Sequence, residues 1–169
     1  DVAPHMNINR VLRHLSVETY LAEIDGLAGV VGANNFYLYQ PGPGAPFEFI
    51  PWDKSATFDF WDEPIYARFD DTVIFRTAMQ VPSLKQRYLA HLSEVARVAG
   101  GQGGWLERLA NQAIQLTRDS ALADANKPVT NTDYTAAVDD LITHLRDRYV
   151  YLLEAIAAEG TTTSGPSTP

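Results

Sequence analysis

Three oxygen-bearing side chains, Asp25, Asn35 and Asp53, stand where the expected elements of this chain meet. Asp25 ends an N-terminal helical segment, Asn35 precedes an aromatic strand, and Asp53 directly follows a second strand. Two carboxylates and an amide that converge suit a hard cation such as Mg²⁺, which takes oxygen ligands and commonly keeps waters and substrate phosphates. A base Asp, a metal-binding Asn, a strand pair and a metal-binding Asp also follow one another in this order in phosphoryl transfer by protein kinases.

An expected β-hairpin lies between the second and third of these residues. FYLY at 36–39 alternates as a strand, QPGPGAP supplies turn residues, and FEFIPW at 47–52 forms the second strand. Because a hairpin brings its outer ends together, we expect Asn35 and Asp53 to be neighbours, with Asp25 folding back onto the same place. A simpler interpretation stays open, in which Asp25 caps a helix end, Asn35 makes a turn and Asp53 is an exposed loop acid.

The N-terminal segment, residues 7–24, is predicted to form a largely buried helix because apolar side chains recur along it with helical period. Asn7 or Asn9 is expected to cap this helix. Glu18 falls among the apolar positions, which is unusual for a charge without a partner. We expect Glu18 either to reach solvent beside the arginines of this helix or to orient the loop at Asp25.

Further helices are predicted after the hairpin, so the expected fold class is α+β and mostly α. The expected boundaries are, in chain order, a cap at Asp70 or Asp71 for a helix through Met79, a helix start at Pro82, a break at 100–104, and a cap at Thr132 or Asp133 for a long last helix. The apolar side chains expected to be buried on this last helix are Val138, Leu141, Ile142, Leu145, Tyr149, Leu152, Leu153 and Ile156.

Composition limits the class of partner. Acidic residues outnumber basic ones 21 to 13, and the net charge of -8 repels phosphate backbones and anionic lipid surfaces, so we expect no nucleic-acid partner. The chain has no cysteine, which excludes disulfides, thiolate nucleophiles and Cys-ligated zinc and suits an exported protein. No apolar run approaches the roughly 18 residues that a membrane span needs. The histidines lie on separate elements, so we expect no histidine metal site.

Three stretches of the sequence carry a family resemblance. NINRVLRHLSVETYLAEIDG, NNFYLY and FEFIPWDKSATF resemble the CotH kinase family, named for a spore coat protein H, whose members show a helix ending in Asp, an Asn before an aromatic strand, and an Ile-Pro-Trp-Asp segment. The resemblance implies an atypical protein-kinase-like fold that transfers the γ-phosphate of ATP to Ser or Thr of extracellular or coat proteins, with Mg²⁺ or Mn²⁺. By position it implies that Asp25 is catalytic and that Asn35 and Asp53 are metal ligands.

The resemblance also implies a division into parts. Residues 1–158 correspond to the C-terminal lobe of the kinase-like domain, and the β-rich N-terminal lobe with its phosphate-gripping lysine is not expected in this chain. On that expectation the fragment alone is inactive. Residues 159–169, rich in Thr, Ser and Pro, are predicted to be a linker to flanking modules of a secreted or cell-surface protein. Ser55 stands where many members have Asp or Asn, which implies one weaker metal contact.

Two other functions remain open on the residues alone. A catalytically degenerate kinase-like fold would act as a surface adhesin, coat scaffold or binding module, and Asp53→Asn would leave its function unchanged. A carbohydrate-associated module would use Trp52 and Trp61 as a platform, and its glycan binding would survive EDTA.

Overall fold

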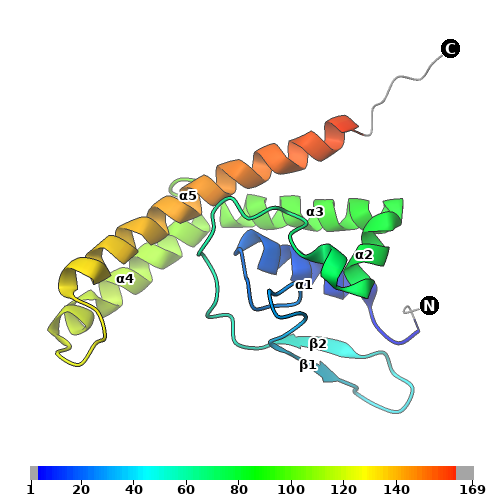
Figure 1. Ribbon diagram of the computed structural model, residues 1–169, viewed down its shortest axis with the longest axis horizontal. Helices are drawn as coiled ribbons and strands as arrows, with labels where there is room; N and C mark the ends of the chain where they lie inside the picture. The colour runs from blue at the N-terminus through cyan, green and yellow to red at the C-terminus, as the bar shows by residue number, and fades with distance from the viewer. Residues whose placement is uncertain (1–3, 163–169) are drawn as a thin grey trace.

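The computed structural model describes residues 4–162, which form a mostly helical α+β fold, as expected. The elements are α1 (Ile8–Tyr20), β1 (Phe36–Tyr39), β2 (Glu48–Pro51), the 3₁₀ turn η1 (Phe69–Asp71), α2 (Val73–Gln80), α3 (Pro82–Ala99), α4 (Trp105–Ala123) and α5 (Asn131–Thr162). In Figure 1, α1 lies beneath α3, the hairpin lies below α1, and α4 and α5 run side by side away from this body.

The hydrophobic core forms where α1 packs against α3. Leu12 and Leu15 of α1 and Tyr88 and Leu92 of α3 are buried almost completely. Full burial of such side chains stabilises the fold by about 1.5–3 kcal/mol each. The Tyr88 hydroxyl donates to Ile65 O and lies 3.1 Å from the Thr19 hydroxyl, so it also ties the end of α1 to the segment before η1. Burial raises the pKa of Tyr88, which keeps this hydroxyl a donor.

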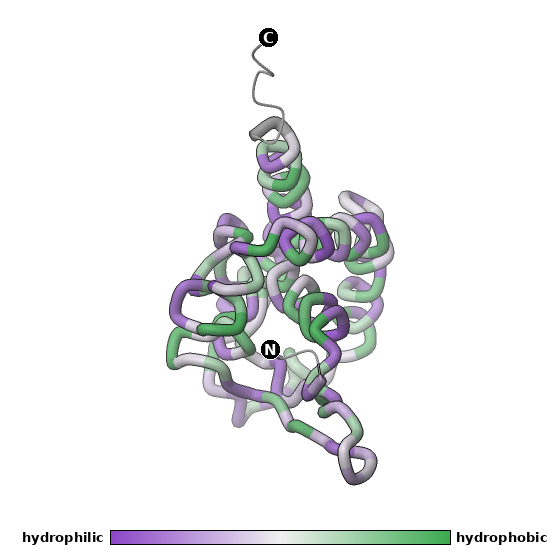
Figure 2. Tube along the Cα trace, turned by 90° about the vertical axis from the view of Figure 1, so that its right-hand side faces the viewer, coloured by the Kyte–Doolittle hydropathy of each residue, from purple (hydrophilic) through white to green (hydrophobic). Residues whose placement is uncertain are grey.

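The hairpin has the predicted antiparallel pairing. Phe36 lies opposite Pro51, and Tyr39 lies opposite Glu48. Phe36 stacks on Phe49 with ring centroids 4.4 Å apart, and both rings pack against the core cluster. In Figure 2 the hairpin lies below the stacked helices. Phe36 and Phe49 pack against the core, whereas Tyr37 and Tyr39 are exposed, so the hairpin has an inner and an outer side.

Several helix ends follow local capping rules. Asn7 caps α1, since its side-chain oxygen accepts from Arg10 N at 3.2 Å, and Pro82 opens α3 as predicted. Thr130 and Asp133 cap the start of α5 reciprocally: the Thr130 backbone N–H donates to the Asp133 carboxylate, and the Asp133 N–H donates to the Thr130 hydroxyl. The expected cap at Thr132 or Asp133 was therefore placed too late, although Asp133 takes part.

Two other expected boundaries were wrong. Asp70 and Asp71 do not cap α2, because they form η1 and the helix begins after Thr72. The first helix ends at Tyr20 rather than at residue 24, since Ala22 has φ 51 and leaves the helical conformation. The four residues after Tyr20 therefore belong to the loop that carries Asp25, and this loop starts closer to the core than the sequence indicated.

The burial predicted for the last helix was only partly right. Leu145 and Leu152 are buried, but Leu153 is 44% exposed and the remaining predicted side chains are partly exposed. Figure 1 shows the reason: the first half of α5 runs beside α4 away from the body, and only its second half passes over α3 and the core. Helical period identifies an apolar face, but it does not say whether another element covers that face.

The predicted C-terminal linker overlaps this helix. Because α5 continues through Thr162, the first part of the expected linker, residues 159–162, is helical. Residues 163–169 lie outside the described part of the chain.

Candidate functional site

An arginine of α5 fixes the end of α1, from which the Asp25 loop departs. Arg148 is 1% exposed, and its guanidinium donates to the carbonyls of Thr19, Tyr20, Trp61 and Glu63. The last carbonyls of a helix have no partner within it, and here a buried cation satisfies two of them. Burial lowers the pKa of Arg148. Sequence reasoning missed this residue, whose one signal is a basic side chain within the apolar stretch of the last helix.

Backbone hydrogen bonds close the loop at residues 21–35 so that its two ends meet. Val30 N donates to Ile24 O at 2.9 Å, and Asn34 N donates to Gly26 O at 2.9 Å. The return of the chain to Gly26 brings Asn34 and Asn35 next to Asp25. The glycine-rich loop thus folds back on Asp25, as the sequence predicted.

Two amides hold the Asp25 carboxylate. Asn35 Nδ2 lies 2.8 Å from Asp25 Oδ2 and 2.9 Å from the backbone oxygen of Asp25, and Asn34 Nδ2 lies 3.0 Å from Oδ1. Since Asn35 uses its nitrogen toward Asp25, its side-chain oxygen is directed elsewhere and remains an acceptor. The backbone N–H of Asp25 donates to Glu23 Oε1 at 2.9 Å, which fixes the acid from its other side.

Asp53 lies just after the last paired residues of the hairpin. Trp52 N donates to Asn35 O at 3.0 Å, so the residue before Asp53 pairs directly with Asn35. Asp53 is exposed, and its Oδ1 accepts the Ser55 hydroxyl at 2.8 Å, while within residues 4–162 its Oδ2 has no hydrogen-bond partner. Ser55 therefore holds one oxygen of Asp53 and leaves the other available to a ligand.

Asn35 and Asp53 share an uncommon backbone conformation. Asn35 has φ 52 and Asp53 has φ 37, in the left-handed region that non-glycine residues seldom adopt. Asn and Asp tolerate this region best, because their short polar side chains can bond locally. Such conformations cluster at functional sites, and here they mark both ends of the hairpin.

Glu18 contacts both the loop that carries Asp25 and the turn that follows Asp53. It is 4% exposed, and its carboxylate accepts Leu27 N at 2.7 Å, Lys54 Nζ at 2.6 Å and His14 Nε2 at 2.9 Å. Burial raises the pKa of Glu18, but the bonds from His14, Lys54 and Leu27 outweigh it and hold that pKa below the ordinary value. Of the two roles expected for Glu18, the structure shows the contact with the Asp25 loop.

A family model described as CotH kinase protein matches residues 1–152 of the chain. The chain belongs to the CotH kinase family. Membership indicates an atypical kinase-like protein and, in general, the use of ATP and a divalent metal. No curated protein matches the chain. Among the described residues, no helix is both long and apolar enough to cross a membrane.

The site residues fit the divalent metal that the CotH kinase family implies. Residues 4–162 contain no group of three or more His, Cys, Asp and Glu side chains placed to hold a metal ion. Mg²⁺ does not require such a cage, since it commonly binds one or two protein oxygens together with phosphates and waters. The side-chain oxygen of Asn35 and Oδ2 of Asp53, at adjacent hairpin ends and without a hydrogen-bond partner among the described residues, are a donor set of that kind.

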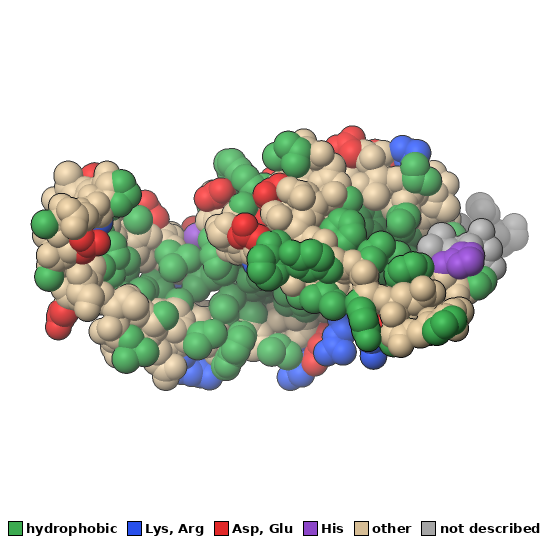
Figure 3. All heavy atoms as spheres, turned by 90° about the horizontal axis from the view of Figure 1, so that it is seen from below, with side chains coloured by type: hydrophobic (Ala, Val, Ile, Leu, Met, Phe, Trp, Pro, Cys, Tyr) green, Lys and Arg blue, Asp and Glu red, His purple; other side chains and the backbone are tan. Residues whose placement is uncertain are grey.

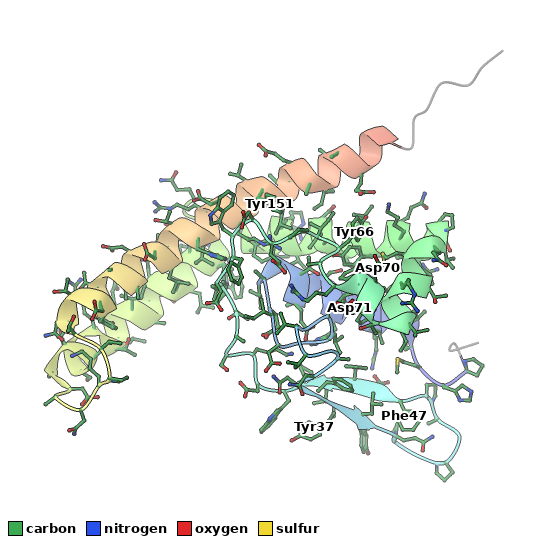
Figure 4. All side chains as sticks on the ribbon, in the orientation of Figure 1. Tyr37, Phe47, Tyr66, Asp70, Asp71 and Tyr151 are labelled. Atoms are coloured by element: carbon green, nitrogen blue, oxygen red, sulfur yellow. The ribbon has the colours of Figure 1, made fainter. Side chains whose placement is uncertain are left out.

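The other residues that the sequence offered as candidates lie apart from the site formed by Asp25, Asn35 and Asp53. Figure 4 shows Asp70 and Asp71 beside α2, away from Tyr37 of β1. Trp52 and Trp61 pack against different elements. The ring centroids of Trp52 and Tyr37 of the hairpin are 5.4 Å apart, and those of Trp61 and Tyr151 of α5 are 6.2 Å apart. The structure thus gives each ring its own tyrosine partner and offers no support for one shared sugar platform.

Proposed function

We propose that this chain carries the catalytic acid and the metal-binding hairpin of an atypical protein kinase, which transfers the γ-phosphate of ATP to Ser or Thr of a protein substrate. The observation that carries the proposal is the clamp of Asn35 on Asp25, formed beside the hairpin end at Asp53. This arrangement puts a base candidate and two free oxygen ligands at adjacent points of one surface.

Asp25 acts as the general base in this proposal. The acceptor hydroxyl gives its proton to the Asp25 carboxylate as its oxygen bonds to the γ-phosphorus, and the bond from that phosphorus to the β–γ bridging oxygen breaks to release ADP. Each oxygen of Asp25 accepts one amide bond, from Asn34 or Asn35, and keeps a second lone pair for the incoming proton. These amides orient the carboxylate before the acceptor arrives.

Asn35 and Asp53 act as the metal ligands. Mg²⁺ or Mn²⁺, when bound, neutralises charge on the transferred phosphate. Asn35 would contribute its side-chain oxygen, because its nitrogen is committed to Asp25, and Asp53 would contribute Oδ2. The exposure of Asp53 leaves room for phosphate oxygens on the same cation. Ser55 acts by orienting Asp53 rather than by binding metal.

The proposal also covers the part of the kinase-like domain that this chain forms and where the protein acts. The helices and hairpin of residues 1–158 act as the C-terminal lobe of a kinase-like domain, which works together with a β-rich lobe that supplies the phosphate-gripping lysine. The protein acts outside the cell or at its surface, on extracellular or coat proteins, with flanking modules attached through the C-terminal segment. The absence of cysteine and the acidic charge are compatible with an exported protein that binds no nucleic acid.

A binding module without phosphate transfer is the second candidate. It is favoured by the outer side of the hairpin, where Tyr37 is 53% and Trp52 is 58% exposed. Figure 3 shows hydrophobic side chains spread over the face that carries the hairpin. Exposed aromatic groups of this kind occur at surfaces that bind other molecules.

Phosphate transfer separates the two candidates. The intact parent protein would be incubated with [γ-³²P]ATP, Mg²⁺ or Mn²⁺ and a Ser-rich acceptor, and label on protein Ser or Thr would be measured. Wild type would be compared with Asp25→Asn and Asp53→Asn, and with Asp62→Asn as a matched control at an exposed acid outside the site. We expect label with wild type and the control, and none with the two site variants at unchanged melting temperatures. Equal label in all four proteins, or none with wild type, would contradict the proposal.

A further inference from the structure

We propose that Glu18 is a positioning residue that couples the Asp25 loop to the Asp53 turn and sets the relative position of the two acids. This inference rests on the function proposed above, because it assigns Glu18 a part in phosphate transfer. It makes Glu18 one of the residues on which activity depends, although it touches neither substrate nor metal.

The two oxygens of Glu18 serve different loops. Oε2 accepts the backbone N–H of Leu27, two residues after Asp25, and Oε1 accepts Nζ of Lys54, the residue directly after Asp53. One carboxylate thus joins both segments through short bonds. Charge-assisted hydrogen bonds of this kind are roughly twice as strong as neutral ones, and burial limits their screening by salt.

The Asp25 loop also lies directly on the Glu18 carboxylate. A Cβ added to Gly26 would lie 2.6 Å from Glu18 Oε2 and 2.7 Å from its carboxyl carbon, closer than real side chains approach. A side chain at position 26 would force the Glu18 carboxylate to move, because the backbone that follows Asp25 is in contact with Glu18 on α1. Because α1 is packed against α3, Glu18 gives this loop a rigid support.

Backbone bonds join the same two segments, and those nearest the acids act just before each acid in the chain, at Ile24 and at Trp52, whose N–H donates to Asn35 O at 3.0 Å. Ile24 N donates to Ala56 O at 3.1 Å, and Phe58 N donates to Leu21 O at 2.9 Å. These bonds keep the loops adjacent without Glu18, so its loss should not unfold the site. The Glu18 bonds act after each acid, at Leu27 and Lys54, so Glu18 fixes the side of each acid that the bonds at Ile24 and Trp52 leave open. Misplacement of a catalytic group by 1 Å can cost about 100-fold in rate.

Glu18→Gln is a nearly isosteric test of this role. A glutamine has one acceptor oxygen, and its amide nitrogen would face either the Leu27 N–H or the Lys54 ammonium as donor against donor. One of the two connections must therefore break while the volume of the side chain is kept. Lys54→Met removes the other partner, and Glu94→Gln is a matched control, since Glu94 forms an exposed pair with Arg97 on α3.

The first readout is the kinetics of phosphate transfer by the intact protein. We expect Glu18→Gln to lower kcat by about tenfold or more with little change in KM for ATP, since the reacting groups are misplaced rather than absent. Lys54→Met should lower kcat in the same way. The double variant should be no worse than Glu18→Gln alone, because each change by itself already interrupts the link that runs from Leu27 through Glu18 to Lys54. Glu94→Gln should match wild type. Unchanged kcat in Glu18→Gln, or additive losses in the double variant, would overturn the proposal.

The second readout is amide hydrogen exchange, which needs no activity. We expect faster exchange at residues 24–35 and 53–58 in Glu18→Gln, and we expect Lys54→Met to speed exchange at 24–35, a segment that does not contain the substituted residue. If wild type transfers no phosphate, the proposed function fails, and exchange still decides whether Glu18 couples the loops. Exchange that changes around only one of the two loops, or around neither, would overturn the coupling.

Discussion

The side-chain nitrogen of Asn35 lies 2.8 Å from Oδ2 of Asp25 and 2.9 Å from its backbone oxygen, so one amide holds both the carboxylate and the main chain of the acid. Asn35 also directly precedes β1. The contact therefore links the loop after α1 to the hairpin whose other end carries Asp53. It also directs the oxygen of Asn35 away from Asp25.

Asn35→Asp should make the stability of the protein depend on pH. The substitution replaces a donor to Asp25 with a second carboxylate, and two like charges at this distance raise the pKa of one of the pair. A folded-state pKa above the unfolded value means that stability is lost as pH rises. We therefore expect a larger loss of melting temperature at about pH 8 than at about pH 5. Asn35→Ala, which adds no charge, is the control and should lose a similar amount at both pH values.

Gly26→Ala should disturb the Asp25 loop because its Cβ would collide with the Glu18 carboxylate. We expect a loss of about 1–3 kcal/mol in the free energy of unfolding, as for other overpacked sites, and a loss of phosphate transfer. Gly42→Ala is the matched control, since an added Cβ there meets nothing within 4 Å. Urea denaturation of both variants checks the prediction, and equal stabilities would contradict it.

Arg148→Met should strongly destabilise the protein. The methionine would leave the carbonyls of Tyr20 and the 61–63 segment without their buried donor, and each such group costs about 1–3 kcal/mol, while Thr19 O would keep its bond from Ala22 N. We expect a total loss of at least about 3 kcal/mol in the free energy of unfolding. Arg97→Met, at an exposed pair on α3, should leave the stability unchanged. A similar melting temperature for the two variants would show that Arg148 does not hold the end of α1.

The hairpin and the meeting of Asp25 with Asn35 could be predicted from sequence because their signals are local. Alternating aromatic residues, a Pro- and Gly-rich turn and polar residues at the strand ends lie within one short stretch. The bonds of Arg148 to Thr19 and Tyr20 join residues 129 and 128 positions apart, and no local pattern encodes them. Glu18 gave a partial signal as a charge among apolar positions, but its partners Leu27 and Lys54 follow from the folded loops.

Glu23→Gln should stabilise the protein at neutral pH. Glu23 is 5% exposed, its Oε1 accepts Asp25 N, and its buried Oε2 has no hydrogen-bond partner among the described residues. Burial is the main cause that raises the pKa of Glu23 above its ordinary value of 4.5. The folded state then holds a proton that the unfolded state has lost, so stability falls as pH rises above 4.5 toward the folded-state pKa.

Glutamine in place of Glu23 keeps an acceptor for Asp25 N and has no charge to bury. Thermal melts from about pH 5 to pH 8 should show a smaller decline for Glu23→Gln than for wild type. Glu154→Gln, at an exposed position of α5, should follow the wild-type curve. A parallel decline in wild type and Glu23→Gln would mean that Glu23 is not the group responsible.

The central claim is that Asn35 and Asp53 hold one divalent cation beside Asp25, and paramagnetic broadening by Mn²⁺ in ¹H–¹⁵N spectra tests it most directly. With ATP present and Mn²⁺ below one equivalent, we expect the side-chain amide of Asn35 and the backbone amides at 53–55 to broaden first, before those at Asp70 and Asp71. The broadening should disappear in Asp53→Asn and persist in Asp62→Asn. Broadening that begins at another acidic segment, or that is unchanged in Asp53→Asn, would contradict the account.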